Sequence, residues 1–203
     1  MNLDKVTAQG LVLLGCGKMG SAMLEGWLKQ GVPPASVWVI EPYPSDWLKA
    51  QGVHLNTDLP AAPAIVLLAV KPQMMGAALP QVTALGGKDT LFLSIAAGTT
   101  IASFEATFGA ATPLIRAMPN TPALIGEGMT GLFADSNISP ADKALASSIC
   151  EAVGKIVWVD SEKQMDDITA VSGSGPAYVF AFLESLEKAA IAQGLSQDQA
   201  RLL

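Results

Sequence analysis

The first 160 residues alternate short apolar runs with segments of helical character. Runs at 64–70 and 91–96 are apolar almost throughout, which is typical of strands covered on both faces of a parallel sheet. Alternating strands and helices predict an α/β fold, with a parallel sheet and helices on both of its faces. The expected strands are 11–14, 36–41, 53–56, 64–70, 91–96, 112–118, 129–134 and 156–159, and the expected helices are 21–30, 47–51, 74–84, 103–108 and 140–153.

From residue 161 the pattern changes to helices alone. Ser161 and Gln164 match a capping box, so a helix is expected to begin at about Glu162. We therefore expect two domains, 1–160 and 161–203.

A second helix of this region is expected at 177–193, after a loop at 172–176. The first half of this helix is apolar on nearly every side, whereas a surface helix of a single domain shows one apolar stripe. We expect it to be buried within a helical domain or against another subunit.

A glycine-rich turn joins the first strand to the first long helix, with Gly15, Gly17 and Gly20 in the pattern Gly-x-Gly-x-x-Gly. Strand, turn and helix in this order are the context of a dinucleotide fingerprint. Gly15 permits the tight turn, Gly17 lets a diphosphate approach the backbone, and Gly20 lets helix and strand pack closely. The phosphates then face a helix N-terminus, which favours anions.

Glu41 follows the second strand, 21 residues beyond Gly20. An acidic side chain at this distance accepts hydrogen bonds from an adenosine ribose, favours a free 2′-hydroxyl and repels a 2′-phosphate. The alternative is a solvated carboxylate at a strand end. Cys16, in the glycine turn, is either reactive, because a helix N-terminus lowers a thiol pKa, or a small residue that fills the turn.

Ligands of open parallel sheets lie beyond the carboxyl ends of the strands. Gly15, Glu41, Lys71 and Ala97 all fall at that edge. His54, the single histidine, lies early in a short strand, so we interpret it as a sheet-edge residue and not a catalytic one.

Asn120 and Thr121 lie between Pro119 and Pro122. The prolines restrict this loop, so it presents an amide and a hydroxyl in fixed positions. The loop is either functional or merely a rigid turn.

Composition narrows the class of partner. The chain is 50% hydrophobic and 15% charged with a net charge of −6, which is a globular composition without the basic surplus that nucleic acid requires. Residues 1–10 lack the apolar core of a signal peptide, and the longest apolar run, 61–70, is too short to span a membrane. Cys16 and Cys150 lack metal-type spacing and suit the cytoplasm. We expect no nucleic-acid, membrane or metal partner.

Five sequence blocks carry a family resemblance. They are GCGKMG at 15–20, AVKPQ at 69–73, SIAAG at 94–98, RAMPNTP at 116–122 and TAVSGSGPAY at 169–178. With these blocks in this order, the chain resembles the pyrroline-5-carboxylate reductases, which make proline. The resemblance implies a Rossmann domain, then a helical dimerisation domain, and hydride transfer from NADH or NADPH to the C=N carbon of a cyclic imine. It also implies a small-molecule substrate and a homodimer or larger homo-oligomer formed through the C-terminal helices.

The resemblance extends to the site residues. Glu162 matches an acidic residue that contacts the amino-acid ligand, although an acidic residue at a helix start is also favourable in itself. The segment Ser172, Gly173, Ser174 and Gly175 either lies against the substrate or is only the joint between domains. We assign no catalytic residue, because a protonated imine is already electrophilic and chiefly needs positioning. The expected cofactor contacts are Leu14, Gly15, Cys16, Gly17, Lys18, Met19, Gly20, Asn56, Ala69, Val70, Lys71, Pro72, Ile95, Ala96 and Ala97, with Glu41 and Asn120 added from the strand-end and loop arguments.

Two features depart from the family. Members that prefer NADP often carry small or basic residues after the second strand, so Glu41 favours NAD. The family's helical domain continues past the position of Leu203 and carries a substrate-binding loop, so this chain is expected to lack part of the substrate site. The alternatives are a non-catalytic dinucleotide-binding protein and a related Rossmann reductase of another small substrate.

Overall fold

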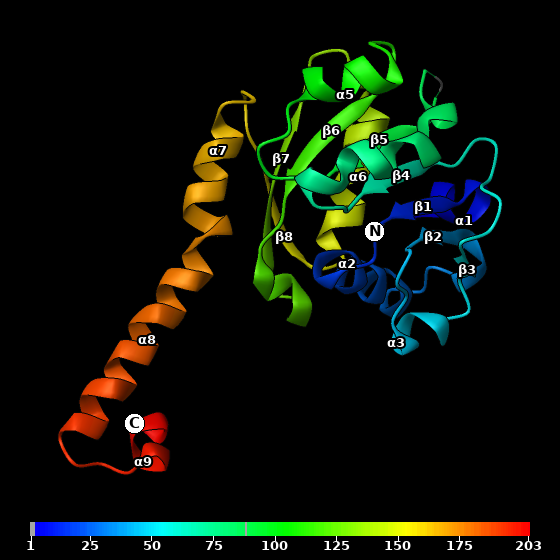
Figure 1. Ribbon diagram of the computed structural model, residues 1–203. Coiled ribbons are helices and arrows are strands. Elements are labelled where there is room, and N and C mark those ends of the chain that lie inside the picture. The colour runs from blue at the N-terminus through cyan, green and yellow to red at the C-terminus, as the bar shows by residue number, and fades with distance from the viewer. Residues whose placement is uncertain (1–2, 88) are drawn as a thin grey trace.

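The computed structural model describes residues 3–87 and 89–203. A layered body is followed by a long helical arm that leads away from it (Figure 1). Eight strands form one sheet in the order β3-β2-β1-β4-β5-β6-β7-β8. The strands are β1 (Leu11–Leu14), β2 (Val37–Ile40), β3 (His54–Leu55), β4 (Ile65–Leu68), β5 (Leu91–Ser94), β6 (Leu114–Met118), β7 (Gly128–Ala134) and β8 (Gly154–Trp158).

Helices cover both faces of the sheet, as predicted. On one face the fully buried Trp27 joins two helices, since its indole N–H donates to the Ile149 carbonyl at 2.9 Å. On the other face Phe104 and Phe108 pack with Phe92 of the sheet. The helices are α1 (Asp4–Gln9), α2 (Lys18–Lys29), α3 (Asp46–Lys49), α4 (Met75–Ala78), α5 (Ile101–Phe108), α6 (Pro140–Glu151), α7 (Gln164–Ile168), α8 (Gly175–Ala192) and α9 (Gln197–Leu202).

The sheet is parallel from β3 to β6, and its last two strands depart from that pattern. β7 runs antiparallel to β6, and β8 runs parallel to β7. Only a 3₁₀ turn, η5 (Thr121–Ile125), lies between β6 and β7. A parallel neighbour would need a crossover of about a dozen residues or more.

Several helix boundaries differ from the sequence predictions. α2 begins at Lys18, inside the glycine turn. The helix expected at 74–84 is broken into α4 and short 3₁₀ turns around Pro72 and Pro80, which cannot donate backbone hydrogen bonds. The predicted capping box is wrong in its serine half, because the Ser161 hydroxyl donates to Oε1 of Gln164 and does not accept from the helix.

The loop predicted at 172–176 is wrong, because a π-helical turn at Thr169–Gly173 joins α7 directly to α8. Pro176 has no N–H to donate to the carbonyl of Ser172, four residues earlier. Asn120 supplies that donor, since its Nδ2 lies 3.1 Å from the Ser172 oxygen. The proline therefore interrupts the hydrogen bonding while the helical path continues.

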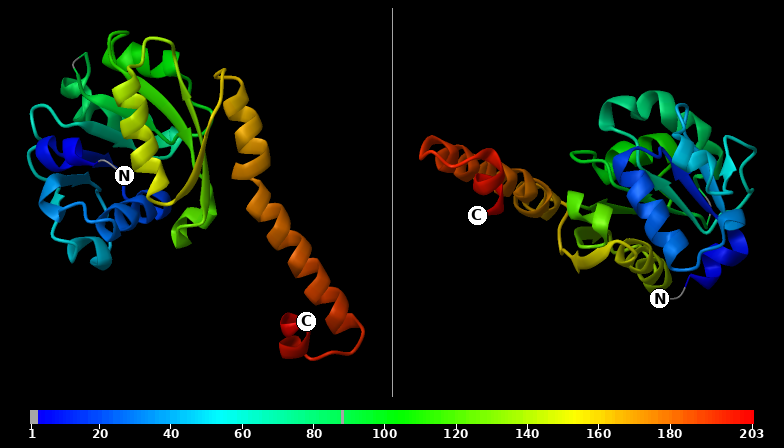
Figure 2. Two further views of the ribbon diagram at one scale, coloured as in Figure 1. Left: turned by 180° about the vertical axis from the view of Figure 1, so that it is seen from behind. Right: turned by 90° about the horizontal axis from the view of Figure 1, so that it is seen from below.

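The arm formed by α8 lies away from the body, as two further views show (Figure 2). No residue of α8 is buried. Its large apolar side chains Tyr178, Phe180, Phe182 and Leu183 are between 52% and 66% exposed. None of the residues that the structure describes buries these side chains, and their burial against another subunit stays a prediction. Among the described residues no helix has the length and apolarity needed to cross a membrane.

Candidate functional site

The glycine turn has the geometry that each of its glycines is predicted to supply. Gly15 has φ +90°, and an added Cβ would lie 2.9 Å from the Ala69 carbonyl oxygen. A Cβ on Gly20 would collide with the Gly15 carbonyl oxygen, so helix and turn pack there without room for a side chain. A Cβ on Gly17 would meet nothing within 4 Å. This open cradle fits a diphosphate approaching the backbone.

The cradle is also electrostatically suited to an anion. α2 begins at Lys18, directly after Gly17, which supplies no side-chain cap, and its first turn holds no acidic residue. The first N–H groups of a helix have no partner inside the helix and carry a partial positive charge. The start of α2 therefore provides donors and a favourable potential for phosphate oxygens.

Glu41 lies against this turn. Its Oε2 accepts a hydrogen bond from the Cys16 N–H at 2.8 Å, and its Oε1 accepts one from the Tyr43 N–H at 3.0 Å. Burial, with a smaller contribution from the Glu41 charge, raises the pKa of the Cys16 thiol to about 12. The thiol is therefore protonated at neutral pH, which favours the interpretation that Cys16 fills the turn over the reactive one.

Asn56 fixes the position of Glu41. Its Oδ1 accepts from the Glu41 N–H at 2.9 Å, and its Nδ2 donates to the Glu41 carbonyl at 2.9 Å. Asn56 has φ +53°, the one positive value among the described residues other than glycine. Asparagine tolerates this left-handed conformation, and such outliers often occur at functional sites.

A cavity of about 530 Å³ opens beside Glu41, at the ends of β2 and β3. Its volume and its place beyond the strand ends fit an adenine ring with its ribose. It is lined by Ile40, Pro42, Asn56, Thr57, Asp58, Leu59 and Gln81.

The segments after β4 and β5 continue the same edge. The Ala69 N–H donates to the Leu14 carbonyl at 2.8 Å, and the Ile95 N–H donates to the Leu68 carbonyl at 3.1 Å. These bonds bring 69–72 and 95–97 beside the glycine turn, with Lys71 and Ala97 exposed. We call this rim, at the carboxyl ends of β1, β2, β4 and β5, the carboxyl edge. Its residues fit a dinucleotide, and the nicotinamide end would lie beside the β4 and β5 segments.

His54 lies outside this edge. Its ring stacks on Trp38 with centroids 4.4 Å apart, and its Nε2 lies 3.0 Å from the Ala35 carbonyl oxygen. These contacts support the prediction of a structural sheet-edge histidine.

Comparisons with known proteins agree with this geometry. The family model described as pyrroline-5-carboxylate reductase dimerisation matches residues 162–203, and a model described as NADP oxidoreductase coenzyme F420-dependent matches residues 10–98. A pyrroline-5-carboxylate reductase of Pasteurella multocida is 38% identical over 97% of this chain and 74% of its own length. One of Haemophilus influenzae is 40% identical over 95% of this chain and 73% of its own length. The chain belongs to the pyrroline-5-carboxylate reductase family.

Solved structures of the family share the fold. A pyrroline-5-carboxylate reductase from Coxiella burnetii superposes with a TM-score of 0.86 at 36% identity, over 96% of this chain and 74% of that one. A Plasmodium falciparum pyrroline carboxylate reductase with NADP bound gives a TM-score of 0.83 at 31% identity, over 95% of this chain and 72% of that one. This member of the reductase family is therefore an oxidoreductase with a nicotinamide-nucleotide domain followed by dimerisation helices.

Asn120 connects the two regions of this reductase. Its Oδ1 accepts from the Met129 N–H at 2.8 Å, while its Nδ2 donates to the Ser172 carbonyl. The amide thus joins the Pro119–Pro122 loop, the start of β7 and the π-helical turn. The side chain is buried and bonded at both ends, so its role as a cofactor contact stays a prediction.

Glu162 makes an ion pair that the sequence analysis missed. Its Oε1 lies 3.0 Å from Nη1 of Arg116 and accepts from the Ile101 N–H at 2.7 Å. The Arg116 side chain is only 7% exposed, and Glu162 is 30% exposed. A buried arginine in an otherwise apolar strand requires an acidic partner, and that signal was available in the sequence. Contact of Glu162 with a substrate stays a prediction.

The predicted substrate segment Ser172–Gly175 spans the end of the π-helical turn and the start of α8. A Cβ on Gly173 would come within 2.9 Å of the Met118 side chain, so this turn packs closely on the end of β6. The segment therefore lies at the joint between the regions, which fits both interpretations of it.

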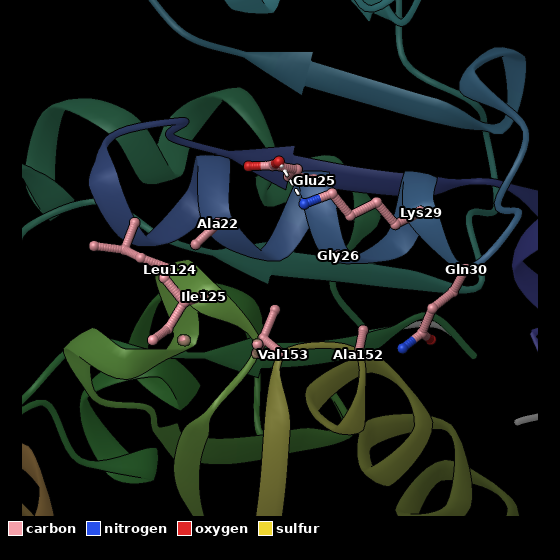
Figure 3. A pocket seen from close by; sticks show the side chains of 11 residues that line it. Ala22, Glu25, Gly26, Lys29, Gln30, Leu124, Ile125, Ala152 and Val153 are labelled. Atoms are coloured by element: carbon pink, nitrogen blue, oxygen red, sulfur yellow. Dashed lines mark ion pairs between the residues drawn. The ribbon is translucent and has the colours of Figure 1, made fainter.

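A separate cavity of about 340 Å³ lies between α2 and η5 (Figure 3). The ion pair between Glu25 and Lys29, at 2.7 Å, borders it on α2, and the exposed side chains of Leu124 and Ile125 border it on η5. None of the predicted site residues lines this cavity. Within residues 3–87 and 89–203, no three His, Cys, Asp or Glu residues cluster as metal ligands would.

Proposed function

We propose that this chain reduces pyrroline-5-carboxylate to L-proline, with NADH or NADPH as hydride donor. The observation that carries the proposal is the carboxyl edge, where an open glycine cradle, a helix start, Glu41 and the β4 and β5 segments meet in a member of this family. These features suit an extended dinucleotide better than a compact anion.

The chemistry requires positioning more than acid–base catalysis. A reduced nicotinamide supplies a hydride to the C=N carbon, and the protonated imine nitrogen becomes the ring amine of proline. The glycine cradle and the start of α2 would hold the diphosphate, and the segments 69–72 and 95–97 would hold the nicotinamide end at the edge of the sheet. The turn Ser172–Gly175 and Glu162, at the joint between the two regions, would then contact the substrate. The protein's main task is then to hold two reactants in a productive orientation.

We also propose that α8 pairs with a second copy of the chain, which would cover its apolar side chains. The Rossmann domain then corresponds to 1–160 and the dimerisation helices to 161–203. Cys16 and Cys150 are free thiols, which supports a reducing, cytoplasmic location.

The test combines turnover with binding. Purified protein is mixed with pyrroline-5-carboxylate and NADH or NADPH, proline is measured by mass spectrometry, and nucleotide binding is measured by nicotinamide fluorescence. We expect proline equal to the nucleotide consumed. Binding without proline would favour a non-catalytic dinucleotide-binding protein, turnover only with another imine or keto acid would favour a related reductase, and absence of binding would exclude both.

A further inference from the structure

We propose that Glu41, held in place by Asn56, makes this chain select NADH over NADPH. The inference rests on the proposed function, because it assigns a selectivity to the same nucleotide site. It concerns which form of the nucleotide binds, so binding measurements test it independently of turnover.

The first step of the argument is that Glu41 cannot easily withdraw. Asn56 bonds both its N–H and its carbonyl, each at 2.9 Å. Asn56 itself is anchored, because its N–H donates to the Val39 carbonyl at 2.9 Å. The backbone of Glu41, directly after β2, is therefore tied to the residue that follows the neighbouring strand β3.

The second step is that its carboxylate is aimed at the ribose position. The hydrogen bonds from the Cys16 and Tyr43 N–H groups hold the two carboxylate oxygens beside the glycine turn, and the adenine-sized cavity opens at the residues on either side of Glu41, Ile40 and Pro42. In a dinucleotide that crosses the glycine cradle, the adenosine ribose lies between these two places. A carboxylate has lone pairs left to accept hydrogen bonds from ribose hydroxyls.

The third step is the charge around this position. The cavity lining includes the acidic Asp58 and contains no lysine or arginine. A 2′-phosphate carries a charge of about −1.5 to −2 at neutral pH, by analogy with other phosphate monoesters. It would therefore meet two carboxylates and no lining cation. Repulsion between like charges at a partly exposed site weakens binding, and it raises the dissociation constant by about tenfold or more.

Lys18 is the competing feature. It lines a neighbouring hollow together with Cys16 and Gly17 of the glycine turn and with Ser21, Glu25, Ser45 and Trp47. A lysine there would attract a 2′-phosphate if the ribose turned toward this hollow. The experiment must therefore separate Lys18 from Glu41.

The experiment measures dissociation constants of NADH and NADPH by fluorescence titration at fixed ionic strength. For the unaltered chain we expect NADH to bind about tenfold more tightly than NADPH or better. Glu41→Gln keeps the shape and removes the charge, so it should bring the two constants to within about threefold of each other by strengthening NADPH binding. Asn56→Gly keeps the left-handed backbone conformation but removes the hydrogen bonds that hold Glu41, so it should shift the ratio in the same direction. The melting temperature of this variant is measured as well, to show that it stays folded.

Three control variants define what the result means. Glu25→Gln removes an acid from the other hollow and should leave the ratio unchanged. Asp58→Asn should shift the ratio less than Glu41→Gln, because Asp58 lacks the bonds to the glycine turn. Lys18→Met should leave the ratio of the two dissociation constants unchanged. A selective loss of NADPH binding in that variant would place the 2′-phosphate beside Lys18 and not against Glu41, and would overturn the proposal.

Other outcomes also overturn it. Tighter binding of NADPH by the unaltered chain, or an unchanged ratio in Glu41→Gln, would show that Glu41 does not select the nucleotide. If neither nucleotide binds, the carboxyl edge is not a nucleotide site, and both the proposed function and this inference are wrong. Tight NADH binding without proline formation would contradict the proposed function and leave the selectivity supported.

Discussion

Gly17 and Gly20 lie in the same turn but differ in what a side chain there would meet. Around Gly17 there is open space, whereas at Gly20 a Cβ would collide with the Gly15 carbonyl oxygen. Gly17→Ala should therefore fold normally and lose nucleotide affinity, because its methyl group occupies the cradle where a diphosphate would approach. Gly20→Ala should lose affinity and stability together, by about 1–3 kcal/mol from overpacking.

Thermal melting and nicotinamide fluorescence on both variants separate these effects. Gly76→Ala is a matched control, because it also has open space around it and lies away from the glycine turn. An unchanged affinity in Gly17→Ala would mean that no diphosphate passes over this turn, and the cofactor site would have to be placed elsewhere.

At the scale of single elements, the Arg116–Glu162 pair fastens the start of the helical region to the sheet. Glu162 also accepts from the Ile101 N–H, so it joins β6, the first turn of α5 and the segment before α7. Glu162→Ala leaves a buried guanidinium without its partner, which should cost about 3 kcal/mol or more. For a chain of this size the melting temperature should fall by roughly 6–12 °C.

Differential scanning calorimetry tests this, with Glu184→Ala as the control. Glu184 pairs with Lys188 on exposed α8, and Lys188 lowers the pKa of its carboxyl, but exposed pairs contribute little to stability. If the melting temperature falls no further in Glu162→Ala than in Glu184→Ala, the Arg116–Glu162 pair does not stabilise the attachment of the helical region to the sheet. If the double variant Arg116→Met/Glu162→Met regains the melting temperature lost in Glu162→Ala, that loss came from the unpaired guanidinium charge.

The sequence predicted elements best where burial dictates composition. β1, β4 and β5 are fully buried strands, and their continuous apolar runs identified them. The reversal at β7 was missed because strand patterning is the same in both directions. The signal for it was the connection between the predicted strands 112–118 and 129–134, which is short for a parallel crossover and contains no predicted helix. The π-helical turn was interpreted as a loop because Ser, Gly and Pro are typical of loops, and the rescue of the Ser172 carbonyl by Asn120 is a long-range contact.

In the candidate site, too, features set by local sequence were predicted and features set by long-range contacts were not. The glycine turn and Glu41 follow local rules of spacing, and the sequence placed both at the carboxyl edge. Asn56 and Arg116 act through partners far away in the chain, so their roles depend on the folded structure. The clamp on Glu41 illustrates this, since 15 residues separate its two members.

At the scale of the whole molecule, the body is well covered on both faces while the arm is not. α8 carries Phe182 and Leu186 one turn apart, and these side chains are 63% and 52% exposed. Apolar surface of this extent usually marks an interface. A symmetric pairing of two copies would bury each side chain twice, once in each protomer.

Replacing both residues by serine therefore tests the assembly without altering the carboxyl edge. Each apolar side chain removed from an interface costs about 1.5–3 kcal/mol, and the double variant removes two from each of two protomers. Phe182→Ser/Leu186→Ser should therefore raise the dimer dissociation constant by roughly 10,000-fold or more. Light scattering should then give the mass of one chain, while NADH affinity stays unchanged because the glycine turn lies in the body. Ser185→Ala, on the same turn of α8, should remain dimeric. A double variant that remains dimeric would show that the two copies meet elsewhere. An unaltered chain that is already monomeric would contradict the proposal that α8 pairs with a second copy.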